Sequence, residues 1–187
     1  MIGVLALQGN FAMHAAACEK AGARVQLVKN PQQLQSIQGL ILPGGESTVM
    51  LKHFELQPAW WPALKAFHAA GKGLFGTCAG LILLAQQVSP AQKSLGFLDV
   101  SVERNAYGRQ IDSHEIHARF DLNGEILDLD MPFIRAPKIT RVGPEVTPVG
   151  WVDGQVVMVQ QGRVLGAACH PEAATHLIHR HFISINQ

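Results

Sequence analysis

Gly73-Leu74-Phe75-Gly76-Thr77-Cys78-Ala79-Gly80 is the stretch of this chain that says most about its fold. The apolar run Gly73–Phe75 is typical of a short buried strand, and the apolar segment Ala79–Val88 is expected to be a helix. Between them the spacing Gly-x-Cys-x-Gly matches the nucleophile-elbow pattern, with cysteine in place of serine. We therefore expect a sharp strand-to-helix turn at Cys78. The helix dipole there favours the thiolate, which is the reactive form of cysteine.

Apolar runs and helical segments alternate through the first half of the chain. The expected strands are Ile2–Leu7, Arg24–Val28, Gly39–Leu42 and Gly73–Phe75; the expected helices are Phe11–Ala21, a short helix capped by Ser47 and running through His53, Trp60–Ala70 and Ala79–Val88. This order predicts a parallel sheet with right-handed crossovers.

The second half reads as shorter strands between turns. The expected strands are Glu115–Phe120, Phe133–Ile134 and Ile139–Val142, then a hairpin of Gln155–Gln160 and Val164–Cys169 around Gly162, followed by a last helix, Thr175–Ile185. There is no internal repeat, and no linker divides residues 1–187. We predict a single α/β domain with a mostly parallel sheet and an antiparallel extension.

Composition excludes several classes of function. With 187 residues, 48% of them hydrophobic and 16% charged, the chain is expected to fold around a sizeable core. A net charge of +1 gives no indication of nucleic-acid binding. The N-terminal apolar run is too short for a signal peptide or a membrane span, so we expect a cytoplasmic protein that does not bind membranes. Three cysteines without a Cys-x-x-Cys pair predict neither disulfides nor a zinc site.

A cysteine nucleophile requires a base, and the base requires a partner that fixes its tautomer. Of the nine histidines, His170 is the best placed, because it follows an expected strand and parallel sheets gather chemistry at the carboxyl ends of strands. Glu172 lies two residues further on, within reach of the imidazole. His176 and His179 share a helix face, but no carboxylate or cysteine completes a metal-ligand set, so we expect no metal and no cofactor.

A cysteine elbow followed far downstream by His-x-Glu resembles the triad glutamine amidotransferases. Further segments narrow the resemblance to the glutaminase subunits of pyridoxal 5′-phosphate synthase, and they extend along nearly the whole chain. These segments are Leu5–Gly9, Leu42–Thr48, Arg104–Gln110 and Phe133–Pro137, together with Gly76–Gly80 and His170–Glu172. The family usually has leucine after His-Pro-Glu, whereas this chain has Ala173 and Ala174.

The resemblance implies a flavodoxin-like three-layer sandwich and a defined reaction. Such subunits hydrolyse L-glutamine to L-glutamate and ammonia, and the ammonia passes to a separate synthase subunit that builds pyridoxal 5′-phosphate. The implied triad has Cys78 as nucleophile, His170 as base and Glu172 as its orienter. The implied glutamine-binding residues are Gly45, Glu46, Ser47, Arg104, Ile134 and Arg135. The chemistry agrees, because an arginine can bind the α-carboxylate of glutamine through charge-assisted hydrogen bonds.

Three other functions remain open on the sequence alone. The first is a glutaminase that supplies a different amidotransferase pathway. The second is a cysteine hydrolase or protease of similar fold that needs no partner. The third is a non-catalytic binding module, against which the intact set of Cys78, His170 and Glu172 argues.

Overall fold

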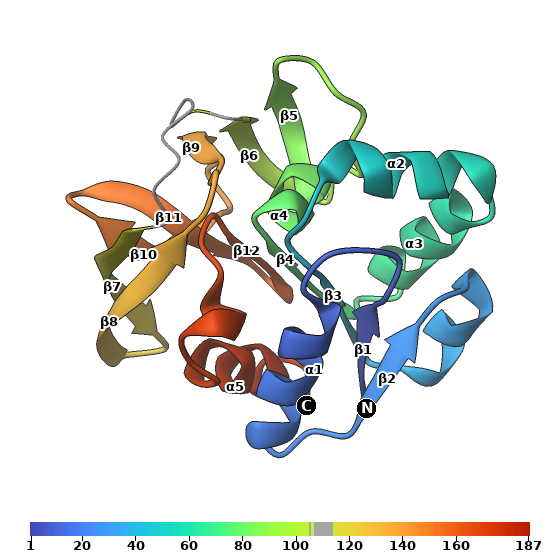
Figure 1. Ribbon diagram of the computed structural model, residues 1–187, viewed down its shortest axis with the longest axis horizontal. Helices are drawn as coiled ribbons and strands as arrows, with labels where there is room; N and C mark the ends of the chain where they lie inside the picture. The colour runs from blue at the N-terminus through green and yellow to red at the C-terminus, as the bar shows by residue number, and fades with distance from the viewer. Residues whose placement is uncertain (105, 107–113) are drawn as a thin grey trace.

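The parallel strands occupy one half of a large mixed sheet (Figure 1). The computed structural model describes residues 1–104, 106 and 114–187. Within these residues, five parallel strands lie in the order β2-β1-β3-β4-β12. Their bounds are β1 Ile2–Leu5, β2 Val25–Val28, β3 Gly39–Leu42, β4 Gly73–Thr77 and β12 Val164–Ala167. Counted along the chain, this is the 2-1-3-4-5 order of flavodoxin-like folds, so the predicted fold class is confirmed.

Antiparallel strands continue the same sheet beyond β12, as predicted. They are β11 Gln155–Gln161, β10 Thr147–Val152, β7 His114–Leu122 and β8 Glu125–Phe133, paired in that order. A second, three-stranded sheet has the order β5-β6-β9, formed by β5 Ala85–Ser89, β6 Leu98–Glu103 and β9 Lys138–Val142. The hairpin predicted around Gly162 is present as β11 and β12.

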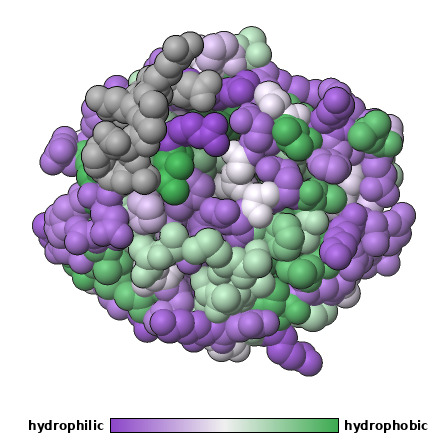
Figure 2. All heavy atoms as spheres, viewed as in Figure 1, coloured by the Kyte–Doolittle hydropathy of each residue, from purple (hydrophilic) through white to green (hydrophobic). Residues whose placement is uncertain are grey.

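Helices cover both faces of the parallel strands, which gives the three predicted layers. They are α1 Phe11–Lys20, α2 Ser47–Leu56, α3 Trp60–Ala69, α4 Ala79–Leu84 and α5 Leu177–Ser184, with 3-10 helices η1 Pro31–Ser36 and η2 Pro171–Ala173. The crossovers from β1 to β2 and from β3 to β4 run toward opposite edges, so their helices lie on opposite faces. Accordingly α1 packs beside α5, and α2 packs on α4. In Figure 2 a pale apolar area covers the region of the Ala-rich α1, with hydrophilic residues around most of the rim.

Three local predictions were wrong. The helix expected over Ala79–Val88 ends at Leu84, because the next residues pair with β6 and form β5. Ser47 is the first residue of α2 rather than its cap, and its hydroxyl donates to Gln92 Oε1 at 3.0 Å instead. The expected strand Phe133–Ile134 is only the end of β8, which begins at Glu125.

Two hairpins escaped the sequence analysis although each has a recognisable turn. Asn123-Gly124 joins β7 to β8, and Asp153-Gly154 joins β10 to β11. All four residues have positive φ, between 45° and 86°, as a two-residue type I′ hairpin turn requires. Asn-Gly and Asp-Gly between runs of alternating hydrophobicity are the sequence features that could have revealed β8 and β10.

The core between α2 and α3 gives a test of the fold. Phe54 is fully buried and packs with its ring centroid 5.7 Å from those of both Trp60 and Trp61. We expect Phe54→Ala to lower the free energy of unfolding by about 3–5 kcal/mol, because it removes buried apolar surface and leaves a cavity. Urea denaturation measures the loss. The control is Leu56, which is exposed on the same helix. Leu56→Ala should change the free energy of unfolding by less than about 0.5 kcal/mol. Equal losses in the two variants would contradict the packing described.

Candidate active site

The turn between β4 and α4 holds Cys78 in a strained backbone conformation. Its φ is 47° and its ψ is −102°, a combination that residues other than glycine rarely adopt. A Cβ atom on Gly76 would lie 2.5 Å from the carbonyl carbon and oxygen of Gly80. A Cβ atom on Gly80 would lie 2.0 Å from the carbonyl oxygen of Leu42. Only glycine fits at either position, which explains both glycines of the elbow motif.

The parallel pairing of β4 with β12 brings His170 to the elbow. The two strands end side by side, and the Cys78 amide donates to the carbonyl oxygen of Ala167 at 2.8 Å. His170 follows β12, and its own amide donates to Pro132 at the end of β8 at 3.0 Å. A Cβ atom on Gly44 would lie 2.4 Å from His170 Cε1 and 3.4 Å from Cys78 Cβ. The imidazole and the thiol-bearing side chain therefore pack against the same glycine.

Glu172 lies behind His170 and is almost completely buried. His170 Nδ1 and Glu172 Oε1 are 2.8 Å apart, so the imidazole donates from Nδ1 and presents Nε2 as its other nitrogen. The side chain of Glu172 is 0% exposed and that of His170 is 6% exposed. The structure thus brings Cys78, His170 and Glu172 together at the carboxyl ends of neighbouring strands, where the sequence placed them.

Hydrogen bonds and neighbouring charges outweigh burial in this group. Burial disfavours the charged form of His170, but hydrogen bonds with Cys78 and Glu172 raise its pKa to about 10. Burial also disfavours the Glu172 carboxylate, but the hydrogen bond from His170 and the proximity of His14 and His170 lower its pKa to about 2. Near neutral pH the group is therefore an imidazolium held by a carboxylate, with an available proton beside the thiol.

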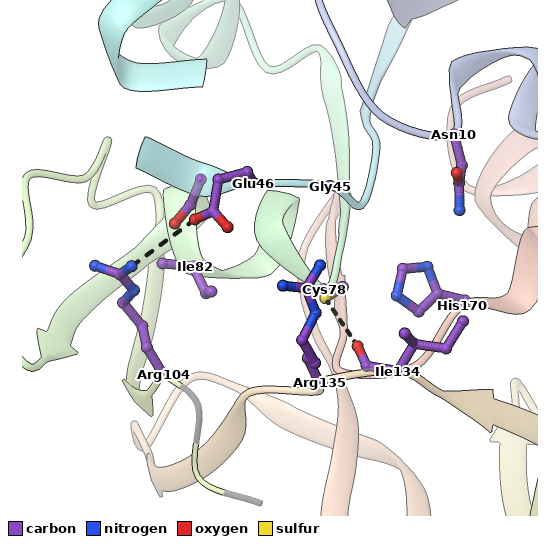
Figure 3. Close-up of a pocket in the computed structure, with 10 residues that line it drawn as sticks. Asn10, Gly45, Glu46, Cys78, Ile82, Arg104, Ile134, Arg135 and His170 are labelled. Atoms are coloured by element: carbon purple, nitrogen blue, oxygen red, sulfur yellow. Dashed lines mark hydrogen bonds and ion pairs between the residues drawn. The ribbon is translucent and has the colours of Figure 1, made fainter. Parts of the chain in front are cut away.

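A cavity of about 260 Å³ opens above Cys78 (Figure 3). Its size lies just below the range of about 300–1,000 Å³ usual for small-molecule sites, which suits a ligand no larger than an amino acid. It is lined by Asn10, Gly45, Glu46, Ser47, Cys78, Ile82, Arg104, Ile134, Arg135 and His170. All six predicted substrate-binding residues are in this set. The sequence analysis missed Asn10 and Ile82; the position of Asn10 just beyond the end of β1 could have revealed it.

One wall of the cavity is the loop after β3, which Gln8 holds in place. Gly45 has a φ of 147°, and a Cβ atom there would lie 2.4 Å from Gln8 Oε1. Gln8 accepts a hydrogen bond from the Glu46 amide at 3.1 Å and donates to the Glu46 carbonyl at 3.3 Å. The loop is thereby fixed to the end of β1 with its backbone close to the cavity.

Two guanidinium groups line the opposite side. Arg104 Nη2 lies 4.0 Å from Glu46 Oε1, so these two side chains meet across the cavity (Figure 3). Arg135 has a positive φ of 46°, and its side chain also lines the cavity (Figure 3). The carbonyl oxygen of Ile134 lies 3.9 Å from Cys78 Sγ. Of the motif Arg104–Gln110, residues 105 and 107–110 lie outside the described residues.

Comparison with known proteins identifies the family of this chain. The profile of the SNO glutamine amidotransferase family matches residues 4–186. The chain belongs to this family. A relative from Deinococcus radiodurans, named pyridoxal 5′-phosphate synthase subunit PdxT, is 47% identical over 98% of this chain and 96% of the relative. A relative of the same name from Koribacter versatilis is 49% identical over 91% of this chain and 87% of the relative. A crystal structure of a glutamine amidotransferase superposes with a TM-score of 0.90 at 36% identity, covering 99% of this chain and 98% of that one.

This member of the glutamine amidotransferase family also has a buried polar cluster that the sequence analysis did not connect with the site. His14 on α1 and His179 on α5 are fully buried, with His14 Nδ1 and His179 Nε2 2.9 Å apart. His14 Nε2 lies 3.0 Å from Thr77 Oγ1 and 3.4 Å from Glu172 Oε2. On the sequence alone His179 is notable only for the helix face that it shares with His176, and nothing there distinguishes His14. No spacing rule links residues 165 positions apart, so only the packing of α1 on α5 reveals the pair.

Two expectations concerned metals and membranes. Among the described residues of this family member, no group of three or more His, Cys, Asp and Glu side chains could hold a metal ion. In the same part of the chain, no helix is long and apolar enough to cross a membrane.

The buried histidines predict how stability depends on pH. Burial lowers the pKa of His14 to about 4 and that of His179 to about 3, whereas the ordinary value is 6.5. The unfolded chain therefore takes up protons first, so the stability that these groups contribute is complete above pH 6.5 and is lost as pH falls toward 3–4. We expect His179→Leu to reduce the slope of unfolding free energy against pH in this range, as measured by urea denaturation.

The control removes buried volume without removing a histidine. Cys18 is a buried residue of α1, and Cys18→Ala should lower stability at every pH. The slope of unfolding free energy against pH should stay as in the parent, because burial raises the pKa of the Cys18 thiol to about 12 and the thiol remains neutral over this range. If His179→Leu kept the parent's slope of unfolding free energy against pH, this would show that His179 does not remain neutral in the folded chain.

Proposed function

We propose that this chain hydrolyses L-glutamine to L-glutamate and ammonia with Cys78 as nucleophile, His170 as acid and base, and Glu172 as the group that orients His170. The observation that carries the proposal is the arrangement of these three side chains at one end of the sheet, with Cys78 and His170 lining a cavity of about 260 Å³. Membership of a glutamine amidotransferase family supports the reaction type.

The lining of the cavity suits glutamine as substrate. The cavity is small, and Arg104 and Arg135 offer positive charge for the α-carboxylate of an amino acid. Glu46, opposite Arg104, offers a carboxylate for the α-ammonium group. We further propose that Gly45, Glu46, Ser47, Arg104, Ile134 and Arg135 are the glutamine-binding residues. Ser47 would act through its backbone, since its hydroxyl already donates to Gln92.

In the first step the Cys78 thiolate attacks the side-chain amide carbon of glutamine. Backbone N–H groups of the elbow and of the Gly45 loop are the candidate donors to the oxyanion that forms. The His170 imidazolium gives its proton to the amide nitrogen, the carbon–nitrogen bond breaks, and ammonia leaves. A thioester on Cys78 and a neutral His170 remain.

In the second step water releases the product. Neutral His170 removes a proton from the water molecule, and the hydroxide attacks the thioester carbon. The carbon–sulfur bond breaks, glutamate leaves, and the thiolate and imidazolium are restored. Throughout, Glu172 accepts the hydrogen bond from His170 Nδ1 and stabilises the imidazolium.

We propose that the ammonia passes to a separate synthase subunit that makes pyridoxal 5′-phosphate. The relatives named pyridoxal 5′-phosphate synthase subunit PdxT, at 47% and 49% identity over more than nine-tenths of this chain, support this partner over that of another amidotransferase pathway. They also argue against a hydrolase that works without a partner. The complete set of Cys78, His170 and Glu172 argues against a non-catalytic binding module.

The whole chain is proposed to act as one glutaminase domain in the cytoplasm. The family match over residues 4–186 and the continuous sheet that joins the two halves of the chain support a single domain. All three cysteines are free thiols, which is the usual state in a reducing compartment.

Removal of the nucleophile tests the mechanism. Cys78→Ala should have no measurable glutaminase activity in the complex with the synthase subunit, because no other group in the cavity replaces the thiolate. Coupled detection of glutamate measures turnover, and isothermal titration measures whether glutamine still binds. His170→Asn should also abolish turnover, with glutamine binding preserved in both variants. Activity of Cys78→Ala near the parent level would exclude this assignment.

Dependence on the partner tests the proposed assembly. Ammonia release from glutamine should rise severalfold when the synthase subunit is added to the purified chain, because docking is expected to complete the oxyanion site. The control is an equal concentration of a synthase from another amidotransferase pathway, which should have no effect. Full activity of the chain alone would contradict this coupling while leaving the triad intact.

A further inference from the structure

Three buried polar side chains lie behind the triad and are not among the residues that line the cavity: His14 contacts Glu172, and His179 and Thr77 contact His14. They are His14 from α1, His179 from α5 and Thr77 from the end of β4, and all three are 0% exposed. Both imidazoles pack against Phe75 in T-shaped arrangements, with centroid distances of 6.3 Å for His14 and 5.7 Å for His179. Their ring planes are therefore fixed by apolar packing as well as by hydrogen bonds. The proposed mechanism assigns no role to any of the three.

The second oxygen of Glu172 faces this cluster. Glu172 Oε1 accepts from His170 Nδ1 at 2.8 Å and from Asn10 Nδ2 at 3.4 Å. Glu172 Oε2 has no hydrogen bond of good geometry within the described part of the chain, and His14 Nε2 approaches it at 3.4 Å. A buried carboxylate oxygen without a donor is costly. Whether His14 Nε2 carries a hydrogen therefore affects the Glu172 carboxylate of the triad.

The surroundings of His14 select one tautomer. Its Nε2 faces two oxygens, Glu172 Oε2 and Thr77 Oγ1, and a lone pair there would point toward the carboxylate. The hydrogen therefore belongs on Nε2. His14 Nδ1 must then accept, and the nitrogen 2.9 Å away, His179 Nε2, must donate. This assignment leaves His179 Nδ1 without a hydrogen.

Thr77 connects the same nitrogen to the other parts of the site. Its Oγ1 also accepts a hydrogen bond from the amide of Gly44 at 3.0 Å. Gly44 is the residue against which His170 and Cys78 both pack, and Thr77 directly precedes Cys78. One imidazole N–H thus faces the triad carboxylate and a hydroxyl that joins the elbow to the loop after β3.

We propose that His14, held in its Nε2–H tautomer by His179, is a positioning residue that fixes the Glu172 carboxylate relative to the nucleophile elbow. It touches neither the cavity nor the substrate and acts through Glu172 and Thr77. This inference rests on the proposed glutaminase reaction. It adds a requirement that the triad motifs do not contain: a neutral histidine on the first helix, oriented by a second histidine on the last helix.

A double-mutant cycle on the complex with the synthase subunit tests the proposal. Glutaminase kcat and KM are measured for the parent, His14→Leu, Glu172→Gln and the double variant. By analogy with the partners that orient metal-bound histidines, His14→Leu should lower kcat about tenfold, with KM within about threefold. In the Glu172→Gln background the same substitution should change kcat less than about twofold, because its effect passes through the carboxylate.

Rescue and a matched control separate positioning from packing. His14→Gln keeps a donor near the position of Nε2 and an acceptor for His179, so its kcat should return to within about threefold of the parent. His181→Leu removes another buried histidine of α5, which pairs with Gln160 outside the site and should leave kcat near the parent value. Equal kcat in His14→Leu and the parent, or fully multiplicative effects in the double variant, would overturn the proposal.

Nitrogen NMR of the imidazoles in the parent chain gives a readout that needs neither turnover nor a folded variant. The His14 ring should remain neutral with its hydrogen on Nε2 near pH 7. A hydrogen on Nδ1 of His14 would refute the proposal even if the variants failed to fold. If the parent complex released no ammonia from glutamine, the proposed function would fail, while the tautomer measurement would still decide whether His14 holds Glu172.

Discussion

The site depends on a sharp backbone turn at Cys78, which is possible only because Gly76 and Gly80 have no side chains. Cys78 has a φ of 47°, and that conformation persists because the surrounding structure fixes it from several directions. Gly76 and Gly80 approach each other, and Gly80 approaches the carbonyl of Leu42, at distances that exclude any side chain. The amide of Cys78 is anchored to the carbonyl of Ala167 on β12. Because β12 leads to His170, the contact that holds Cys78 also sets the position of His170, its proposed base.

Charge in the site is stabilised by hydrogen bonds rather than by water. His170 and Glu172 are both buried, and burial alone would favour their neutral forms. For His170 the interaction with Cys78 and the 2.8 Å hydrogen bond with Glu172 reverse this effect on the pKa, and for Glu172 the same hydrogen bond and the nearby histidines do so. The two histidines behind them remain neutral because burial lowers their pKa values without a comparable hydrogen-bonded charge. One buried region thus holds a charged pair, His170 and Glu172, and a neutral pair, His14 and His179, and the neighbours of each group decide its charge.

The sequence predicted local features well and boundaries less well. The alternation of strands and helices gave the parallel half of the sheet, and the spacing of Gly76, Cys78 and Gly80 gave the elbow. The helix predicted over Ala79–Val88 was wrong beyond Leu84, because pairing with a distant strand, β6, overrides the helical tendency of Ala85–Ser89. The strands β8 and β10 were missed although the turns Asn123-Gly124 and Asp153-Gly154 precede or follow them. Cys78 and His170 nevertheless follow strands that were predicted, β4 and β12, whereas Ile134 and Arg135 follow β8.

By itself, the sequence predicted the proposed nucleophile Cys78, its base His170 and the orienting Glu172, because each is part of a short motif whose spacing is set by local backbone geometry. It also determined that the first half of the chain forms a parallel sheet, because expected strands and helices alternate there. Only the tertiary structure decided which distant side chains complete the site. Asn10 beside Glu172, Gln8 on the Gly45 loop, and His14 with His179 are joined by contacts between segments far apart in the chain. Such contacts follow from helix packing, and no periodicity or motif along the sequence encodes them.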